Sequence, residues 1–478
     1  MRKVMRSIAT YKGKRVNNFL GLFLVVFSVV SVSAQTPPGS YADVVTKVSS
    51  AVVTIKSTER ARSATQYPFM DDPTFREFFG DRLPQQTPRR AQGMGSGVIV
   101  NSDGYILTNH HVVDGAIEIK VETTDNKTYI AKLVGSDPPS DLAVLKIEAQ
   151  GLPTIPMGNS DRVRVGDAVL AIGNPLGVGQ TVTSGIVSAK GRATGLSDGS
   201  FEDFLQTDAA INRGNSGGAL VNTTGELIGI NSQILSPSGG NIGIGFAIPS
   251  NMAKAVMDQL LKEGKVRRGM LGVTIQSIDA DLASSLNLPA ARGAIVTSVS
   301  AGGPAERAGL KRGDVITAIN KQPVVDDNGL RNLVASKGPG ATVEVTALRN
   351  GRDQNFQIAL AELPDRRRPE TEESTSSGGA STGNEKFGLT LQPLTPQMVS
   401  RFNLEEGDQG LLVTRVDPSS NAANAGIKPG DLIQEVNRQP VRTFEQFNAA
   451  FQQSGAKPAL VLVKRRDQVL FVSLRPGS

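Results

Sequence analysis

The stretch from residue 97 to residue 248 alternates short apolar runs with turn residues. Runs of this length and spacing are typical of antiparallel β-barrels or sandwiches. An earlier run, at 51–55, predicts a first core strand. The later runs lie at 97–100, 105–107, 117–121, 129–134, 142–147, 168–172, 181–187, 227–230 and 242–248. We therefore predict a mainly β domain.

A helical pattern closes this domain. Pro249, Ser250 and Asn251 form a start signal, and Gly264 follows the last apolar position. The apolar residues between them recur on one face, and they are Met252, Val256, Met257, Leu260 and Leu261.

The remaining 200 or so residues contain one pattern twice. The sequence GLKRGDVITAINKQPV at 309–324 returns as GIKPGDLIQEVNRQPV at 426–441, so two copies of one module are expected. Each copy resembles a PDZ domain, in which a glycine-flanked loop offers N–H groups to a terminal carboxylate and an edge strand pairs with the peptide. The candidate loop residues are Gly269, Met270, Leu271, Gly272 and Val273 in the first copy, and Lys386, Phe387, Gly388 and Leu389 in the second. We expect carboxylate capture in the first copy, while in the second a simple strand entry is an equal alternative.

The N-terminus has the pattern of an export signal. Six Lys/Arg and no acidic residue stand in positions 1–18, and an apolar run of about 14 residues follows at 19–32. This run is shorter than the ~20 residues that span a bilayer. Small residues at 32–34 suit cleavage before Gln35, and an uncleaved anchor is the alternative.

Charge and cysteine content exclude several classes of function. Of 51 basic residues, removal of the six in the leader leaves 45, against 45 acidic residues, so the mature chain gives no charge argument for nucleic acid or a membrane surface. The absence of cysteine excludes a thiol protease, a Cys-ligated metal and a disulfide. Two adjacent histidines cannot build a three-histidine zinc site. We expect no cofactor and no metal.

The candidate chemistry centres on Ser216 in Gly214-Asn215-Ser216-Gly217-Gly218. A serine nucleophile needs a base, and the chain has only two histidines, His110 and His111. Asp141, at the start of an apolar run, can orient an imidazole. The order His, Asp, Ser is that of chymotrypsin-type double barrels.

These three motifs resemble the catalytic motifs of the Deg/HtrA family of envelope serine proteases, and the similarity covers nearly all of the mature chain. The resemblance implies His111 as base, Asp141 as orienting acid and Ser216 as nucleophile. His110 stands where the family often has another residue. Adjacent residues on extended chain face opposite sides, and the following Val-Val pair favours His111, so His110 is expected to have a surface or supporting role.

The resemblance also implies the surroundings of the nucleophile. The N–H groups of Gly214 and Ser216 hold the oxyanion, and Asn215 contributes backbone to the same turn. Ala210, six residues before the nucleophile, lies near the base of the primary specificity site, so cleavage after Val, Ala or Ile is expected. The strand edge that pairs with substrate comprises Ser232, Gln233, Ile234, Leu235 and Ser236.

We predict this organisation: a signal peptide at 1–34, a protease domain at 35–265 with a long Phe-rich regulatory loop at 57–95, a first PDZ domain at 266–362, a flexible linker at 363–384 and a second PDZ domain at 385–478. In the family this loop can reach a neighbouring subunit's active site, and a turn packed on its own barrel is the alternative. The expected protein is a periplasmic, ATP-independent serine endopeptidase acting on unfolded proteins, with C-terminal peptides as PDZ ligands and a homotrimer or larger assembly. The alternative is a PDZ-based chaperone or scaffold with little proteolysis.

Overall fold

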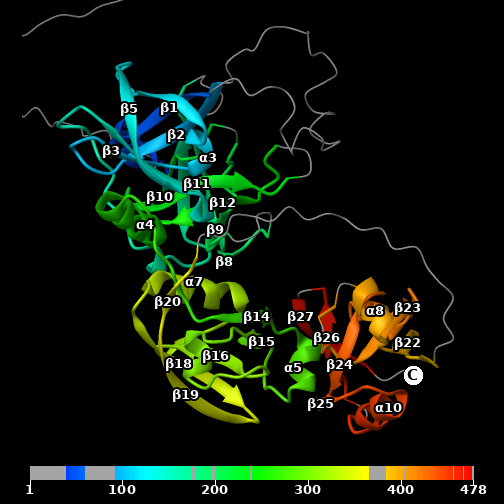
Figure 1. Ribbon diagram of the computed structural model, residues 1–478. Coiled ribbons are helices and arrows are strands. Elements are labelled where there is room, and N and C mark those ends of the chain that lie inside the picture. Colours follow the sequence, from blue (N-terminus) through cyan, green and yellow to red (C-terminus); the bar gives the residue numbers. More distant parts are fainter. Residues whose placement is uncertain are drawn as a thin grey trace, which may run out of the picture. The chain divides into compact units, whose positions relative to one another are not determined.

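The computed structural model describes residues 39–59, 92–174, 179–195, 200–212, 214–236, 240–364, 384–402, 404–405, 407–455, 457–466 and 468–475. Figure 1 shows their helices and strands and labels many of them. The predicted signal peptide, the aromatic cluster of the long loop and most of the predicted linker lie outside these residues.

Two closed barrels form the first domain, as the apolar runs and the His, Asp, Ser order predict. The first has strand order β1-β2-β3-β6-β5-β4. Its strands are β1 (Val52–Glu59), β2 (Gln92–Ile99), β3 (Tyr105–Thr108), β4 (Ala116–Glu122), β5 (Thr128–Asp137) and β6 (Leu142–Ile147). The second barrel has the order β10-β11-β12-β9-β8-β7. Its strands are β7 (Ala168–Gly173), β8 (Thr181–Arg192), β9 (Phe204–Thr207), β10 (Ala219–Asn222), β11 (Leu227–Ile234) and β12 (Gly245–Pro249).

The strands differ from the predicted pattern in two respects. Strands β9 and β10 were not predicted, because each has four residues and neither shows a long alternation. The range 57–95 is not entirely loop, because β1 continues to Glu59 and β2 starts at Gln92. These ends pair with each other, Ser57 opposite Gly93, so ladder hydrogen bonds rather than apolar alternation extend both strands.

Short helices precede or connect the barrel strands, and a longer helix closes the domain. They are α1 (Ala42–Val48), η1 (Ser49–Ala51), α3 (His110–Val113), η2 (Pro138–Ser140), η3 (Ser160–Arg162) and α4 (Ser250–Glu263). Helix α4 ends at Gly264, which adopts φ +70° as its C-cap. Its buried face contains Ala253, Val256 and Leu260. Leu261, predicted on this face, is 39% exposed because Ala253 and Leu260 occupy the centre of the apolar stripe.

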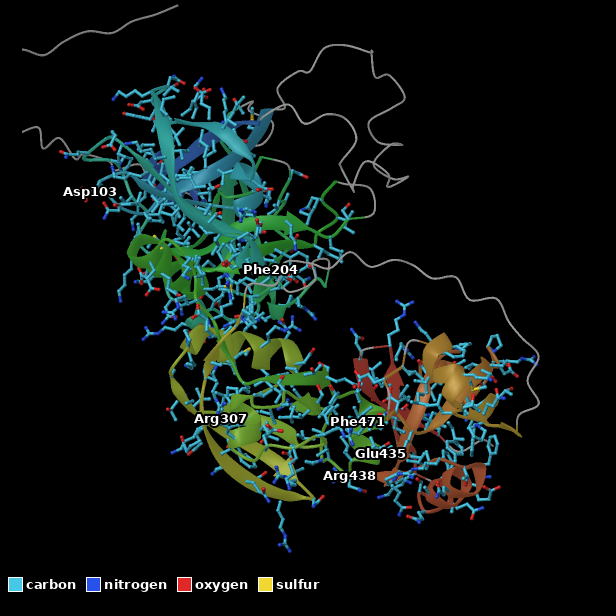
Figure 2. The ribbon with its side chains drawn as sticks, in the orientation of Figure 1. Asp103, Phe204, Arg307, Glu435, Arg438 and Phe471 are labelled. Carbon is cyan, nitrogen blue, oxygen red and sulfur yellow. The ribbon has the colours of Figure 1, made fainter. Side chains whose placement is uncertain are left out.

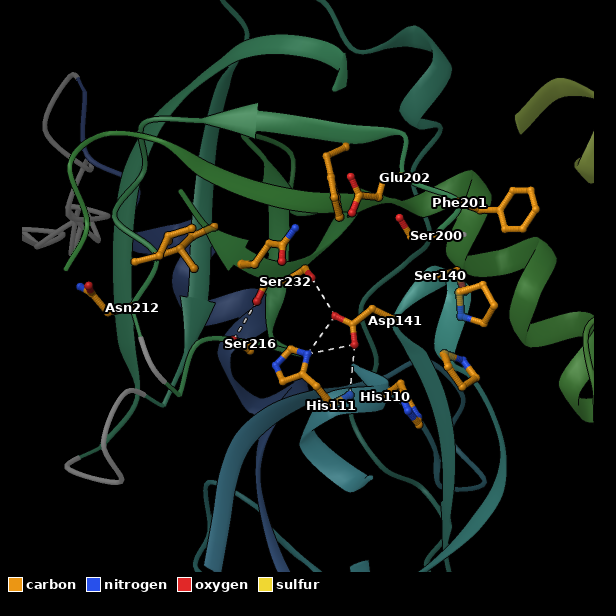
Figure 3. A pocket seen from close by; sticks show the side chains of 16 residues that line it. His110, His111, Ser140, Asp141, Ser200, Phe201, Glu202, Asn212, Ser216 and Ser232 are labelled. Atoms are coloured by element: carbon orange, nitrogen blue, oxygen red, sulfur yellow. Dashed lines mark hydrogen bonds and ion pairs between the residues drawn. The ribbon is translucent and has the colours of Figure 1, made fainter. Parts of the chain in front are cut away.

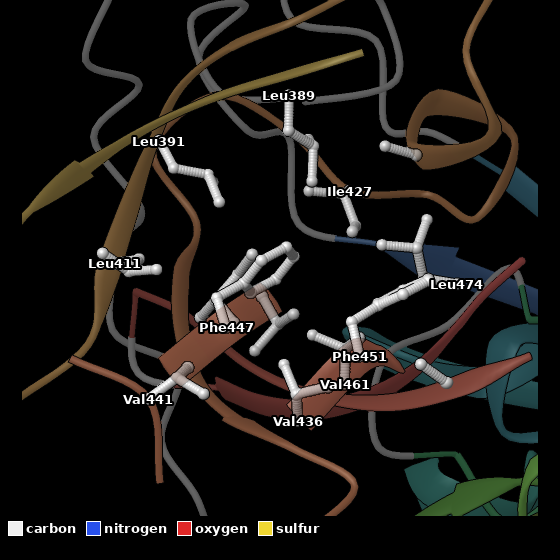
Figure 4. Close-up of a cluster of buried hydrophobic side chains, with 14 of the residues drawn as sticks. Leu389, Leu391, Leu411, Ile427, Val436, Val441, Phe447, Phe451, Val461 and Leu474 are labelled. Atoms are coloured by element: carbon white, nitrogen blue, oxygen red, sulfur yellow. The ribbon is translucent and has the colours of Figure 1, made fainter. Parts of the chain in front are cut away.

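The two repeats fold as separate modules of similar topology. The first contains β13 (Gly269–Met270), β14 (Val273–Ser277), α5 (Ala280–Ser285), β15 (Ala294–Val299), α6 (Pro304–Arg307), β16 (Val315–Ile319), β17 (Gln322–Pro323), α7 (Asp327–Lys337), β18 (Thr342–Arg349), β19 (Arg352–Ala359) and β20 (Ala361–Glu362). The second contains β21 (Asn384–Lys386), β22 (Leu389–Pro393), α8 (Pro396–Arg401), β23 (Leu411–Val416), α9 (Asn421–Asn424), β24 (Leu432–Val436), β25 (Gln439–Pro440), α10 (Phe444–Gln452), β26 (Ala459–Arg465) and β27 (Gln468–Leu474). Figure 4 shows the core of the second module, where Phe447 and Phe451 of α10 pack among aliphatic side chains.

The repeated Gly-Asp pair has a structural role in both modules. Asp314 and Asp431 are each 1% exposed. Arg349 Nε donates to Asp314 Oδ1 at 2.7 Å, and Arg465 Nε donates to Asp431 Oδ1 at the same distance. A buried carboxylate is stable only when it is paired in this way, which explains why the motif occurs twice.

The two modules also contact each other directly. Ile278, Leu282 and Ile295 of the first form one apolar cluster with Leu460, Leu462 and Phe471 of the second. The side-chain amide of Gln276 donates to the Phe471 carbonyl (2.8 Å) and accepts from its N–H (2.9 Å). Figure 2 labels Phe471 and, on the same module, Glu435 and Arg438. Glu435 pairs with Arg312 of the first module.

Candidate active site

His111 and Asp141 are brought together by the pairing of β3 with β6. Thr108 at the end of β3 lies opposite Ala143 at the start of β6, so the residues just beyond these strand ends are neighbours. His111 Nδ1 is 2.9 Å from both carboxylate oxygens of Asp141. The His111 backbone N–H also donates to Asp141 Oδ1 at 3.1 Å. Both the position and the ring orientation of the imidazole are therefore set by one carboxylate.

Asp141 is held in an unusual backbone conformation by several contacts. Its φ is +54°, the left-handed region, which is uncommon for residues other than glycine and is often found at functional sites. Its carbonyl oxygen accepts from His110 N (3.1 Å) and Asn109 Nδ2 (3.0 Å). Its Oδ2 accepts from Ser232 Oγ at 2.8 Å. Burial raises the pKa of this carboxyl, but the hydrogen bonds from His111 and Ser232 and the charge of His111 outweigh burial and lower its pKa below the usual value.

Ser216 sits in a turn between β9 and β10 that the first barrel helps to hold. Ser96 of β2 donates from its N–H to the Ser216 carbonyl (2.8 Å) and from its hydroxyl to the Gly214 carbonyl (2.6 Å). Gly214 and Gly217 have φ values of +95° and +81°, which favour glycine. A Cβ at Gly217 would also collide with the Ser96 carbonyl oxygen and Thr108 Oγ1. The two glycines of the Gly-x-Ser-Gly pattern are thus favoured by the turn.

In this structure the Ser216 hydroxyl donates to the carbonyl oxygen of Ser232 at 2.9 Å. Figure 3 shows this bond beside the His111–Asp141 pair. A serine side chain has one rotatable bond between Cα and Oγ, so a single rotamer change redirects the hydroxyl. Hydrogen bonds of catalytic groups are often looser before substrate binds.

His110 is separated from Ser216 by its place on α3. The predicted geometry of two neighbours on extended chain is wrong, because both histidines lie in the first turn of a short helix. Figure 3 nevertheless shows the His110 ring turned away from Ser216. Its Nδ1 is buried without a hydrogen-bond partner among the described residues, and its Nε2 is 3.8 Å from Asp114 Oδ1.

Asn215 has a backbone role in the predicted oxyanion turn. Its N–H donates to the Asn212 carbonyl at 3.0 Å, which closes the turn. This N–H is therefore used within the chain, and the N–H groups of Gly214 and Ser216 are the candidates for a ligand oxygen.

A cleft of about 540 Å³ surrounds the three residues. Its lining comprises His110, His111, Pro138, Pro139, Ser140, Asp141, Ser200, Phe201, Glu202, Phe204, Ile211, Asn212, Ser216, Ser232, Gln233 and Ile234. Of the predicted substrate residues, Ala210, Leu235 and Ser236 are not in this lining. The Ala210 carbonyl accepts from Thr183 Oγ1 at 2.8 Å, and Leu235 is 44% exposed.

One contributor to the cleft was not predicted from the sequence, and a second has a contact beyond its predicted role. Residues 200–202 have no apolar period, yet the N–H of Phe201 donates to the Pro139 carbonyl (2.7 Å) and anchors this segment next to Asp141. Ser232 was predicted only as substrate-pairing backbone, but its hydroxyl supports Asp141. A Ser two residues from the end of an apolar run has many structural roles, so no sequence signal singles it out.

The first PDZ loop has N–H groups that point outward. The carbonyl of Leu271 accepts from Ala305 N and that of Gly272 from Ser300 N, each at 2.9 Å. In a trans peptide unit the N–H points opposite to the C=O, so the N–H groups of Gly272 and Val273 face away from these partners. Gly272 has φ +76°. In the second loop, Lys386 is the last residue of β21. The Gly388 carbonyl accepts from Asp417 N at 2.7 Å, so the Leu389 N–H points away from Asp417.

Within the described residues, no group of three or more His, Cys, Asp or Glu side chains is placed to hold a metal ion. None of the helices in the described ranges is long and apolar enough to cross a membrane.

Protein-family models match three ranges of the chain. A trypsin-like peptidase domain model matches residues 95–230, and PDZ domain models match residues 269–360 and 412–465. Among solved structures, the HtrA-type protease AlgW with decapeptide is 49% identical with a TM-score of 0.54, and covers 68% of this chain and 100% of its own. The same protease with tripeptide is 44% identical with a TM-score of 0.56, covering 68% and 98%.

Curated relatives extend the similarity to almost the full length. A probable periplasmic serine endoprotease, DegP-like, from Chlamydia trachomatis is 42% identical over 448 residues, covering 93% of this chain and 88% of that protein. A probable periplasmic serine protease, do/HhoA-like, from Haemophilus influenzae is 42% identical over 472 residues, covering 95% and 97%. The chain has two barrels around His111, Asp141 and Ser216, and two PDZ modules follow them in the sequence. It belongs to the Deg/HtrA family and is a serine endopeptidase.

Proposed function

We propose that this enzyme cleaves unfolded proteins in the periplasm with Ser216 as nucleophile, His111 as base and Asp141 as the orienting acid. The His111–Asp141 contact at 2.9 Å is the observation that carries the assignment. It leaves Nε2 of the ring as the nitrogen that takes a proton from serine. A purely non-enzymatic PDZ scaffold is not favoured, because its relatives are named as endoproteases.

The chemical step follows from these positions. Ser216 Oγ turns from the Ser232 carbonyl to His111, which takes its proton as Oγ attacks the scissile carbonyl carbon. Asp141, kept ionised by its lowered pKa, stabilises the imidazolium that forms. The N–H groups of Gly214 and Ser216 donate to the oxyanion. His111 then gives the proton to the leaving amine, and water repeats the sequence to release the acyl group.

The acid side of the pH profile should report a single proton. Because the pKa of Asp141 is lowered, this carboxylate keeps its charge while the imidazole becomes protonated as the pH falls, and only the neutral imidazole is a base. We expect log kcat/KM against pH to approach a slope of one below neutrality. Stopped assays with a peptide substrate between pH 5 and 8 measure this slope, and a slope of two would mean that Asp141 titrates together with His111.

Substrate selection should depend on exposed small apolar residues. Ile211 and Ile234 line the cleft. Ala210 lies outside the lining, and it places no carboxylate at the position proposed for the base of the specificity site. We expect cleavage after Val, Ala or Ile, mainly in the unfolded form of a protein, because these residues are buried in folded chains. Mass spectrometry of products from one protein, offered folded and unfolded, gives the sites. Frequent cleavage after Lys or Arg, or equal rates on both forms, would contradict this specificity.

The first PDZ module is proposed to capture C-terminal peptides through the loop from Gly269 to Val273, and the loop from Lys386 to Leu389 is the corresponding site of the second. A substrate held at such a loop has a raised local concentration near Ser216.

We also propose export by the N-terminal signal, assembly into a homotrimer or a larger cage, and control by the Phe-rich loop of residues 57–95. Sedimentation of the mature protein tests the assembly, and a strict monomer would contradict it.

Peptide capture can be separated from catalysis by one glycine. At Gly272 the φ of +76° and a Cβ position 3.2 Å from Pro304 Cδ disfavour alanine. We expect Gly272→Ala to weaken binding of an apolar peptide with a free carboxylate by about fivefold or more, the equivalent of ~1 kcal/mol of strain or above, and to leave short-peptide cleavage unchanged. Gly302, with φ +68° and open space around it, is the matched control. If Gly302→Ala weakens binding equally, the loop has no special role.

A further inference from the structure

The two PDZ modules differ at the strand edge that a peptide would use. Loop residues Gly272 and Gly388 correspond, with φ values of +76° and +73°. The strands that follow them also correspond, because Val273 pairs with Val299 and Leu389 pairs with Val416 at the same places in the repeat. In the first module β14 is an end strand of its described sheet, with β15 beside it. In the second module β22 lies between β23 and β21.

Strand β21 occupies the position of a ligand. It pairs antiparallel with β22, from Asn384 opposite Leu391 to Lys386 opposite Leu389, and it runs into the loop. A peptide captured by a PDZ domain adds to the same edge with its carboxyl end at the loop. In the first module the segment before the loop takes another course, since β13 pairs with β20.

The residue after β21 packs on α10 and holds the strand to its module. The Phe387 ring centroid is 4.1 Å from that of Phe451 and 6.2 Å from that of Phe447, both on α10. The corresponding residues of the first module are Leu271, Val334 and Leu330, which are all smaller. Phe387 also has φ +61°, a strained conformation for an aromatic residue. Strain of this kind persists where other contacts stabilise it, and the ring stack supplies them.

We propose that residues 384–386 are a built-in ligand of the second PDZ module, held in place by the Phe387 ring, so that this module binds a peptide only when the segment is displaced. The inference rests on the proposed peptide capture and adds regulation to it. Peptides would then bind first at the loop of the first module. The apparent affinity of the second module is its intrinsic affinity multiplied by the fraction of time that its edge is open.

The test uses the full chain with Ser216→Ala, to prevent cleavage, and Gly272→Ala, to weaken the first module. A labelled apolar peptide with a free carboxylate is titrated by fluorescence anisotropy, and its amide-ended form is the control. Phe387→Gly removes the ring at a φ that glycine adopts freely. We expect it to raise affinity by about tenfold or more, while Phe387→Leu, the residue of the first module, gives an intermediate gain. A thermal melt checks that each variant is folded.

A reversible disulfide that fixes β21 to β22 tests the opposite change. The chain has no cysteine, so Glu385→Cys with Thr390→Cys, an opposed pair on β21 and β22, forms one disulfide. In the Phe387→Gly background, oxidation should abolish the gained binding and reduction should restore it. Tight binding with the segment unaltered, no gain after Phe387→Gly, or a gain that survives oxidation would each overturn the inference. Peptide binding by the chain with Ser216→Ala alone is measured separately, so failure of the proposed capture is distinguished from failure of the built-in ligand.

Discussion

Replacing His111 with alanine is expected to lower kcat/KM by on the order of 10⁴- to 10⁶-fold, the range in which removal of a triad base falls. His111 is the histidine whose Nδ1 lies 2.9 Å from Asp141, and without it Ser216 has no group to accept its proton. His110→Ala should retain most of the activity, because the His110 ring is turned away from Ser216. Peptide cleavage rates of the two purified variants check both expectations.

Both histidine variants need a control for folding. His110 follows the buried Asn109 and its own Nδ1 is buried, so its replacement can cost stability, and the thermal midpoint of each variant should be measured beside its rate. His110→Asn, which keeps a polar side chain near Asp114, is the gentler companion variant. Equal loss of activity from His110 and His111 variants that remain folded would contradict the assignment of the base.

The proposed triad could be assigned from the sequence because few residues could serve. With two histidines in the chain and a glycine-flanked serine, the choice of base was nearly made by composition. The double barrel followed from the order of the three residues, and the strands that carry them have the expected short apolar runs. The spacing of Leu142 to Ile147 in particular identified the strand beside Asp141.

Other features depend on contacts that no local pattern encodes. The support of Asp141 by Ser232 joins residues 91 positions apart, and the anchoring of Phe201 at Pro139 joins two loops without periodicity. The expectation that the histidines lie on extended chain was wrong because Asn109, with β-region φ and ψ, starts a helical turn at His110. β21 could not be predicted, since Asn384 to Lys386 are polar residues at the end of a polar stretch.

One apolar run in the sequence corresponds to the contact between the two PDZ modules. The run at 459–463 is apolar at every position, which indicates a strand buried on both faces. Val461 and Val463 face the core of the second module, whereas Leu460 and Leu462 join the cluster shared with the first. A single PDZ module would leave that second face in water.

Hydrolysis of unfolded casein by the purified mature protein, compared with its Ser216→Ala variant, tests the central claim most directly. The alanine variant keeps the turn held by Ser96 and loses only the nucleophilic oxygen, so it should remain folded with a similar thermal midpoint. We expect the wild-type protein to degrade casein without added nucleotide or metal, and the variant to be slower by on the order of 10⁵-fold or more. Equal degradation by the two proteins, or none by the wild type under conditions where it is folded and assembled, would contradict the account.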